Sequence, residues 1–286
     1  MTAGAARTAA RPAGMTVPAG NILGVADSFF VPLGEDRWLA TVHTTGPWDE
    51  RAQHGGPPSA LLGRAMQRCE PREDMVVARF TTEILSSIPV GEVEVRARLA
   101  RPGRSVQLLE AVLTAAGREV AWARAWRVLR TDCPDAGPGL AKPPPLPGAG
   151  APLTPGGWVD GYLSAIEWRA VHGAFGEPGP ATVWARMRYP LVPDEEPAPL
   201  ERVLAVADSG NGISGELDLR HWLFINPELT VHLFREAAGE WICLDAQSNV
   251  AAGGTGLATS ILSDLDGPVG VGAQALLVAA RPGRPG

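Results

Sequence analysis

Four positions stand out because their residue types could carry hydrolytic chemistry. Asp208 precedes a glycine-rich segment, Asn226 precedes a proline, Gln274 interrupts an apolar strand pattern, and His54 precedes a Gly-Gly pair. A carboxylate can take a proton from water as a general base. Neutral amides can orient that water, because they offer both donors and an acceptor. Together these side chains could activate a water molecule for attack on a carbonyl carbon.

The glycine pair Gly55-Gly56 could supply the complementary group, a binding site for an oxyanion. It is followed by two prolines and then by apolar residues at three- and four-residue steps, a pattern that predicts a helix over 59–69. Backbone N–H groups at a helix start carry the positive end of the dipole. Glycine also lets a carbonyl approach the backbone closely. We therefore expect Gly55, Gly56 and the adjacent His54 to bind substrate.

Each candidate also has a purely structural interpretation. Asp208 could accept hydrogen bonds from a local turn, Asn226 could simply begin a strand, and His54 could cap its own loop. Gln274 could face solvent by strand alternation, whereas a buried glutamine would need partners. The catalytic interpretation requires the side chains of Asp208, Asn226 and Gln274 to converge to within about 3–4 Å of a shared point.

The elements that must position these residues occur in two similar sets. In the first half, alternating apolar segments predict strands at 28–32, 37–43, 76–87, 91–100, 105–115 and 118–129. In the second half, a helix is predicted over 200–207. Second-half strands are predicted at 166–174, 181–189, 222–224, 228–235, 240–249, 256–264 and 269–278.

A gapless internal repeat supports this duplication. Residues 117–125 align with residues 267–275, which matches Arg124 with Gln274. Two copies of a strand–strand–helix–meander unit resemble the hotdog fold, so the chain is predicted to be α+β. We expect a double hotdog, with two antiparallel sheets each wrapped around a central helix. Asp208 and Asn226 have no clear match in the first copy, so the second half is expected to supply the base and the amides.

Length and composition divide the chain further. With 286 residues, two domains are expected. Small residues and two arginines predict a flexible tail at 1–20, without the apolar core of a secretory signal. Residues 131–157 are rich in Pro and Gly and hold too few apolar residues to pack, which predicts a linker. The hotdog domains are therefore expected at 21–130 and 158–280.

The composition also excludes several classes of function. A net charge of −6 leaves no basic footprint for nucleic acid, and no apolar run approaches the roughly 20 residues of a membrane span. The three cysteines cannot all pair and lack metal-ligand spacing, which indicates a reducing compartment and predicts a cytoplasmic protein. No phosphate-binding glycine loop or Gly-x-Ser-x-Gly motif is present, so we expect no cofactor, no metal and no serine nucleophile.

Four segments resemble the bacterial type II acyl-CoA thioesterases and their thioesterase-like relatives. Residues 53–62 are similar to that family's glycine-rich helix start, and 204–208 to its helix that ends in a catalytic aspartate. Residues 226–235, followed by Gly239-Glu-Trp241, are similar to the strand that carries its catalytic threonine. Residues 271–274 are similar to the last strand, whose glutamine completes the site. Here Asn226 stands where the family has threonine, although this alignment needs one gap before Trp241, so Thr230 could be the counterpart instead.

The resemblance implies an acyl-CoA thioesterase that hydrolyses fatty acyl-CoA to free fatty acid and CoA. Asp208 would be the general base, Asn226 and Gln274 would orient water, and the chain would form a homo-oligomer. The acyl chain is expected in an apolar tunnel along a central helix, lined by residues such as Leu61, Met66, Leu204 and Phe224.

Two other functions stay open. Hotdog enoyl-thioester hydratases and dehydratases use an Asp–His pair near the helix start, and Asp49 lies five residues before His54. The asparagine in place of threonine would also suit a non-catalytic acyl-CoA binding protein. Turnover of an acyl-CoA, loss of enoyl absorbance, or tight binding without turnover would distinguish the three.

Overall fold

The computed structural model describes residues 27–47, 49–134, 139–150, 161–173, 175–218 and 221–281. The predicted tail at 1–20 lies outside these residues, as do parts of the predicted linker. No helix in the described ranges is long and apolar enough to cross a membrane.

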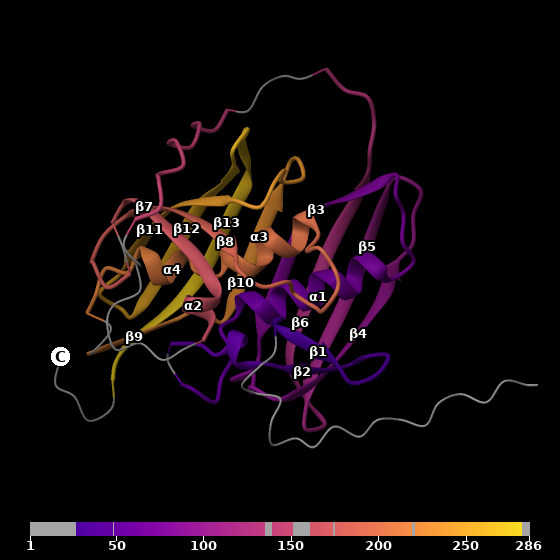
Figure 1. The fold of residues 1–286 in the computed structure, drawn as a ribbon, viewed down its shortest axis with the longest axis horizontal. Helices are drawn as coiled ribbons and strands as arrows, with labels where there is room; N and C mark the ends of the chain where they lie inside the picture. The colour runs from indigo at the N-terminus through magenta and orange to yellow at the C-terminus, as the bar shows by residue number, and fades with distance from the viewer. Residues whose placement is uncertain are drawn as a thin grey trace, which may run out of the picture.

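A single antiparallel sheet of thirteen strands dominates the described part of the chain (Figure 1). The first-half strands are β1 (Phe30–Pro32), β2 (Arg37–Ala40), β3 (Met75–Ile84), β4 (Glu92–Arg101), β5 (Val106–Ala115) and β6 (Arg118–Leu129). The second-half strands are β7 (Ile166–His172), β8 (Ala181–Met187), β9 (Trp222–Ile225), β10 (Glu228–Leu233), β11 (Ile242–Val250), β12 (Thr255–Asp264) and β13 (Gly267–Ala280). The helices are η1 (Val42–Thr44), α1 (Gly56–Arg68), α2 (Tyr162–Ala165), α3 (Pro199–Ala207) and α4 (Gly210–Ile213).

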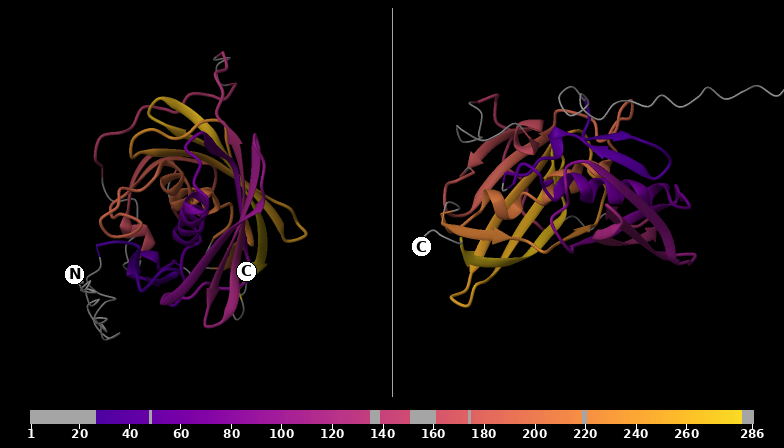
Figure 2. Two further views of the ribbon diagram at one scale, coloured as in Figure 1. Left: turned by 90° about the vertical axis from the view of Figure 1, so that its right-hand side faces the viewer. Right: turned by 90° about the horizontal axis from the view of Figure 1, so that it is seen from below.

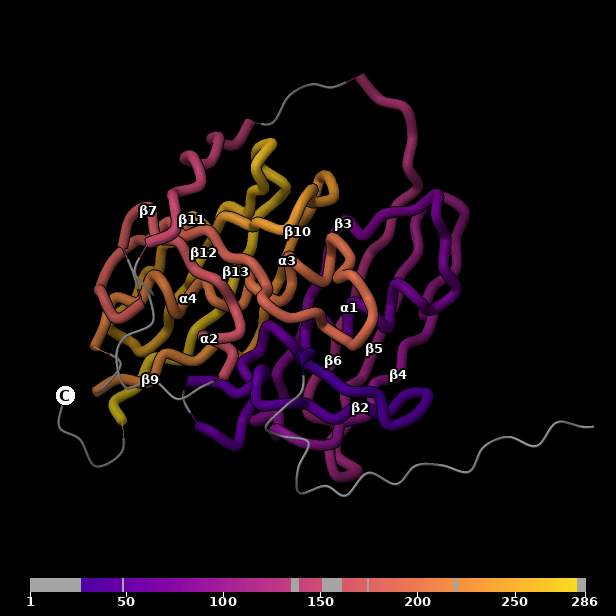
Figure 3. Tube along the Cα trace, in the orientation of Figure 1, coloured from indigo at the N-terminus to yellow at the C-terminus, as the bar shows by residue number. Residues whose placement is uncertain are grey.

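The two halves share one strand order, which confirms the predicted double hotdog. The first runs β1-β2-β4-β5-β6-β3, and the second, read from its outer edge, runs β7-β8-β11-β12-β13-β10. They join where β3 pairs with β10 (Figure 3), and the register places Thr81 opposite Thr230. The two predicted sheets are therefore halves of one continuous sheet, and the joint removes two exposed strand edges.

The sheet curves around α1 and α3, which lie inside it (Figure 2). Both helices are lined with buried apolar residues at helical spacing, so their packing follows from the sequence pattern. They run antiparallel and approach closely through glycine. A Cβ on Gly56 would lie 2.1 Å from the backbone oxygen of Ala205, and one on Gly63 would lie 2.6 Å from Cδ1 of Leu204. The N-terminus of α1 is thereby brought to the C-terminus of α3.

The predicted match between Arg124 and Gln274 is wrong. Strands alternate their side chains between faces. In β6 the neighbours Ala123 and Ala125 are buried, so Arg124 points outward, where it pairs with Glu110. Gln274 points inward and is only 2% exposed. A shift of one residue moves every side chain to the other face of a strand, so the gapless alignment matched residues of opposite orientation.

The described part of the predicted linker packs against the second half, contrary to the expectation that it could not. The indole of Trp184 donates a hydrogen bond to the backbone oxygen of Pro144, and Arg169 donates one to that of Pro147. Leu146 contacts the cluster formed by Trp184, Trp241 and Cys243. Because proline has no backbone N–H, a proline-rich run has few donors of its own. Its carbonyls are therefore left to accept hydrogen bonds from other segments.

Candidate functional site

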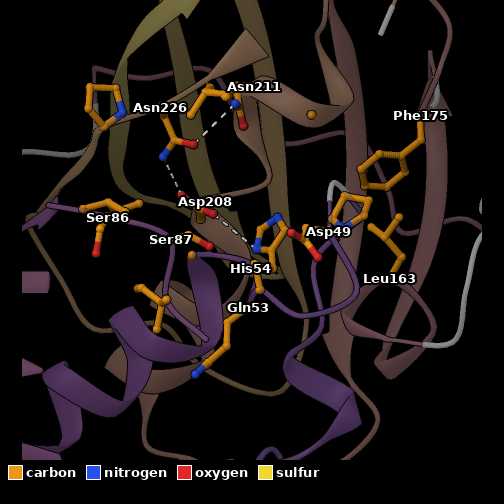
Figure 4. A pocket seen from close by; sticks show the side chains of 18 of the residues that line it. Asp49, Gln53, His54, Ser86, Ser87, Leu163, Phe175, Asp208, Asn211 and Asn226 are labelled. Atoms are coloured by element: carbon orange, nitrogen blue, oxygen red, sulfur yellow. Dashed lines mark hydrogen bonds and ion pairs between the residues drawn. The ribbon is translucent and has the colours of Figure 1, made fainter. Parts of the chain in front are cut away.

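A cavity of about 400 Å³ lies at the junction of the two halves. Figure 4 shows four of its polar side chains, those of Asn211, Asn226, Asp208 and His54, facing one another. The first half contributes the loop before α1 and the segment after β3, and the second half contributes the end of α3, the turn α4 and the loop between β9 and β10. The polar lining side chains are Asp49, Gln53, His54, Ser86, Ser87, Asp208, Asn211 and Asn226.

The predicted trio converges on the carboxylate of Asp208, which ends α3 and is 4% exposed. Asn226 donates a hydrogen bond from Nδ2 to Asp208 Oδ1 at 2.7 Å. Gln274 donates from Nε2 to the same oxygen at 3.3 Å and to the Asp208 backbone oxygen at 3.0 Å. The three side chains thus meet the distance criterion, and Gln274 does not face solvent.

His54 contacts the other carboxylate oxygen. Its Nδ1 lies 3.2 Å from Asp208 Oδ2 and accepts a hydrogen bond from the N–H of Gly56 at 3.1 Å. The imidazole stacks on the ring of Tyr162, with centroids 3.8 Å apart. Burial lowers the pKa of His54, and the charge of Asp208 opposes that shift only in part. His54 is therefore a neutral ring that both caps α1 and borders the cavity.

Tyr162 holds that ring in place from α2. Its hydroxyl donates to the backbone oxygen of Ala205 at 2.8 Å and shares a 2.8 Å hydrogen bond with Ser209. Burial raises the pKa of the Tyr162 hydroxyl well above its ordinary value of 10, so the group stays a neutral donor. The stack gives His54 a defined plane beside Asp208.

The two predicted glycines have different positions. Gly55 lines the cavity, and a Cβ there would lie 2.6 Å from Asp208 Oδ2. Gly56 does not line the cavity: it packs against Ala205, and its N–H is already donated to His54. The structure therefore leaves Gly55 in contact with the cavity and corrects the substrate-contact role expected for Gly56.

Asn211 is a site residue that the sequence pattern did not reveal. Its segment predicted only a glycine-rich turn, but the chain forms the short helix α4 there. The backbone N–H of Asn211 donates to Gln274 Oε1 at 3.0 Å, and its Nδ2 lies 3.5 Å from Asn226 Oδ1. A Cβ on Gly210 would lie 2.7 Å from Oγ of Ser260, so a glycine at this position lets α4 pack closely against β12. An asparagine between glycines, near the aspartate, was the available signal.

Thr230 is not the residue beside Asp208. Its neighbours Leu229 and Val231 are fully buried, so strand alternation turns Thr230 to the outer face. There its hydroxyl bonds to Thr81 and to Glu228. Asn226 alone of the two alternatives reaches the carboxylate.

Asp49 and His54 do not form the Asp–His pair that the hydratase hypothesis requires. Asp49 lines the cavity, but its carboxylate accepts three hydrogen bonds from Arg51. The carboxylate partner of His54 is Asp208 instead. Among the described residues, no three His, Cys, Asp or Glu side chains come together as a metal site would require.

The fold has close counterparts among solved structures. A putative thioesterase from Novosphingobium aromaticivorans is 22% identical, covers 87% of this chain and 98% of its own, and gives a TM-score of 0.63. A hotdog protein of unknown function from Alicyclobacillus acidocaldarius is 14% identical, with 89% and 97% covered and a TM-score of 0.68. An acyl-CoA thioesterase II from Mycobacterium marinum is 18% identical, with 91% and 98% covered and a TM-score of 0.62.

At these identities, the structural likeness establishes the fold alone. No curated protein sequence matches the chain. Family models are more specific, since they describe domains by sequence. Models of the N-terminal and C-terminal acyl-CoA thioesterase domains match residues 44–128 and 130–278, so the chain belongs to the acyl-CoA thioesterase family.

Proposed function

We propose that this chain hydrolyses acyl-CoA thioesters to a carboxylic acid and CoA by direct attack of water, with Asp208 as general base. The observation that carries the proposal is the set of hydrogen bonds on one carboxylate oxygen. Oδ1 of Asp208 accepts from both Asn226 and Gln274 while the carboxylate borders the cavity. Donors from two separate elements hold the carboxylate in one orientation, as a general base requires.

Asn226 is suited to hold the attacking water. Its two amide hydrogens are donated to Asp208 Oδ1 and to the backbone oxygen of Glu228. Its Oδ1 has two lone pairs, and because Asn211 Nδ2 occupies at most one of them, the other can accept from a water molecule. A water that donates one hydrogen to Asp208 and the other to Asn226 directs a lone pair at the thioester carbon. Asparagine can thus do the positioning expected of threonine.

The reaction then proceeds in two steps. Water oxygen bonds to the carbonyl carbon while its proton passes to Asp208, and a tetrahedral oxyanion forms. The N–H of Gly55, at the start of α1, is the proposed donor to that oxyanion, with the helix dipole behind it. Collapse breaks the C–S bond, and the CoA thiolate takes the proton from Asp208. His54 borders the same space, and its Nε2–H can donate to the substrate.

Gln274 contacts Asp208 directly, and Asn211 contacts Gln274 and Asn226. Gln274 does not line the cavity, so it acts on Asp208 and on the backbone of α4 rather than on the substrate. Its two hydrogen-bonding groups tie the end of α3 to α4. This arrangement assigns Gln274 a positioning role and Asp208 and Asn226 the direct contact with water.

Release of free thiol from acyl-CoA tests the proposal. Asp208→Asn keeps the shape of the side chain but removes the base, and it is expected to lower kcat by about 10²–10⁴-fold. Asp245→Asn is the matched control, since Asp245 is exposed, lies outside the cavity and accepts a hydrogen bond from Thr182. Full turnover by Asp208→Asn, or tight acyl-CoA binding without turnover by the wild type, would overturn the mechanism.

A further inference from the structure

The interior that a long acyl chain would need is filled by the protein itself. Leu61, Met66 and Leu204 are 0–1% exposed and belong to the main core cluster. Phe224 is buried in a second cluster. None of the four lines the cavity, so the tunnel predicted along the central helix is absent at these residues. Because α1 and α3 touch through Gly63, no channel runs between them at that point.

The buried apolar wall of the cavity is formed by Ile88, Leu163 and Phe175. Phe175 packs edge-on against Trp168, with ring centroids 4.9 Å apart and an interplanar angle of 81°. The indole of Trp168 in turn donates to the backbone oxygen of Leu163 at 2.9 Å. Figure 4 shows Phe175 and Leu163 together on one side of His54. This wall is braced by neighbouring side chains and limits how far an acyl group can extend.

Another part of the lining is exposed. Ile225 is 43% exposed, and Pro227 and the polar Ser87 are exposed as well. A carrier arm that must reach solvent can leave on this side, while the acyl group lies against the buried wall. The catalytic carboxylate of Asp208 borders the space between them.

The cavity volume sets the size of the substrate. At about 400 Å³ it is at the small end of ligand pockets, which typically span about 300–1,000 Å³. The thioester, the attacking water and the first atoms of the carrier arm take part of this volume. The space that remains for the acyl group is bounded by the braced wall of Ile88, Leu163 and Phe175.

We infer that this site takes compact acyl groups rather than long chains, and that Phe175 sets the limit. The inference rests on the proposed thioesterase function and names its substrate class. It narrows the fatty acyl-CoA expected from the family resemblance to compact acyl groups. In a hydrophobic pocket, one methylene too many typically lowers kcat/KM by about 10–200-fold.

The test is a chain-length series from acetyl-CoA to hexadecanoyl-CoA, measured as kcat/KM. We expect kcat/KM to rise to a maximum at hexanoyl or octanoyl and to fall at least about tenfold by dodecanoyl. Phe175→Ala should move the maximum to longer chains. Phe234→Ala is the matched control, because Phe234 is 56% exposed and outside the cavity, and it should leave the profile unchanged.

A second variant changes the cavity in the opposite direction. Gly212 lines the cavity, and a Cβ there would lie 3.6 Å from Cε1 of Phe175, an ordinary contact. The first carbon of a leucine therefore fits, and the rest of the side chain enters the cavity. Gly212→Leu should lower kcat/KM for octanoyl-CoA at least about tenfold while acetyl-CoA is still hydrolysed.

The outcomes separate this inference from the proposed function. If the wild type hydrolyses hexadecanoyl-CoA as well as hexanoyl-CoA, the size limit is overturned and the thioesterase function stands. If no acyl-CoA is hydrolysed, the proposed function fails, and calorimetric binding of the same series decides the size limit. Affinity that peaks at hexanoyl or octanoyl supports it, and affinity that keeps rising to hexadecanoyl overturns it.

Discussion

Asn226 donates a 2.7 Å hydrogen bond to Asp208, and the two residues come from different elements of the second half. Asp208 ends the helix α3, whereas Asn226 lies between β9 and β10. Their contact lies at the junction with the first half, beside His54 and Gly55. The pair is formed within the second half but borders a cavity that the first half also lines, which makes it the most informative place for mutation.

Removing the amide of Asn226 should impair catalysis more than binding. Asn226→Ala leaves Asp208 with one fewer donor and the water with one fewer acceptor, so kcat is expected to fall about 10²-fold. Asn226→Thr introduces a hydroxyl that can accept a hydrogen bond from water, and this variant should recover most of the kcat lost in Asn226→Ala. Steady-state kinetics on both variants checks this. Equal activity of the alanine and threonine variants would contradict a water-positioning role.

Gly55 is required by the close approach of Asp208. In Gly55→Ala the new Cβ would lie 2.6 Å from Oδ2, so the carboxylate must move. A displacement of this kind is expected to cost about 10²-fold in kcat. Gly253→Ala is the control, because nothing lies within 4 Å of a Cβ there. Unchanged kcat in Gly55→Ala, with circular dichroism like the wild type, would argue against a fixed Asp208.

The neutral His54 predicts a pH dependence of stability. Burial lowers the pKa of folded His54 below its ordinary 6.5, so between these values the unfolded chain binds the proton and the folded chain does not. Protonation therefore favours unfolding, and stability should decrease as pH falls below about 6.5, by up to about 1.4 kcal/mol per pH unit. Urea unfolding at several pH values measures this. His54→Gln should flatten the slope; an unchanged slope would exclude His54 as its source.

The docked linker segment should protect a buried thiol. Burial raises the pKa of Cys243 to about 12, and Leu146 covers its cluster, whereas Cys133 is exposed. In a thiol-labelling time course, Cys133 should react first and Cys243 should resist. Leu146→Asp should accelerate labelling of Cys243 by displacing the segment. Rapid labelling of Cys243 in the wild type would show that the segment does not cover it.

Local patterns in the sequence predicted much of this protein. Apolar alternation located the strands of both hotdog units, and helical spacing located α1 and α3 to within a few residues. The order of motifs led to the acyl-CoA thioesterase family, which the domain models establish. Asp208, Asn226 and His54 could be named because each stands at a boundary between an element and a glycine- or proline-rich loop. Such boundaries are local features of the chain.

The tertiary structure decided which face of a strand each residue occupies and which distant segments touch. A shift of one position changes the face of the strand on which a residue lies. Only the folded sheet therefore shows that Gln274 faces inward and Arg124 outward. Asn211 becomes a site residue because Gln274, far away in sequence, binds its backbone. Gly56 packs against α3 and leaves Gly55 at the cavity, while core side chains fill the expected tunnel. These outcomes arise from the packing of distant segments, which no local pattern encodes.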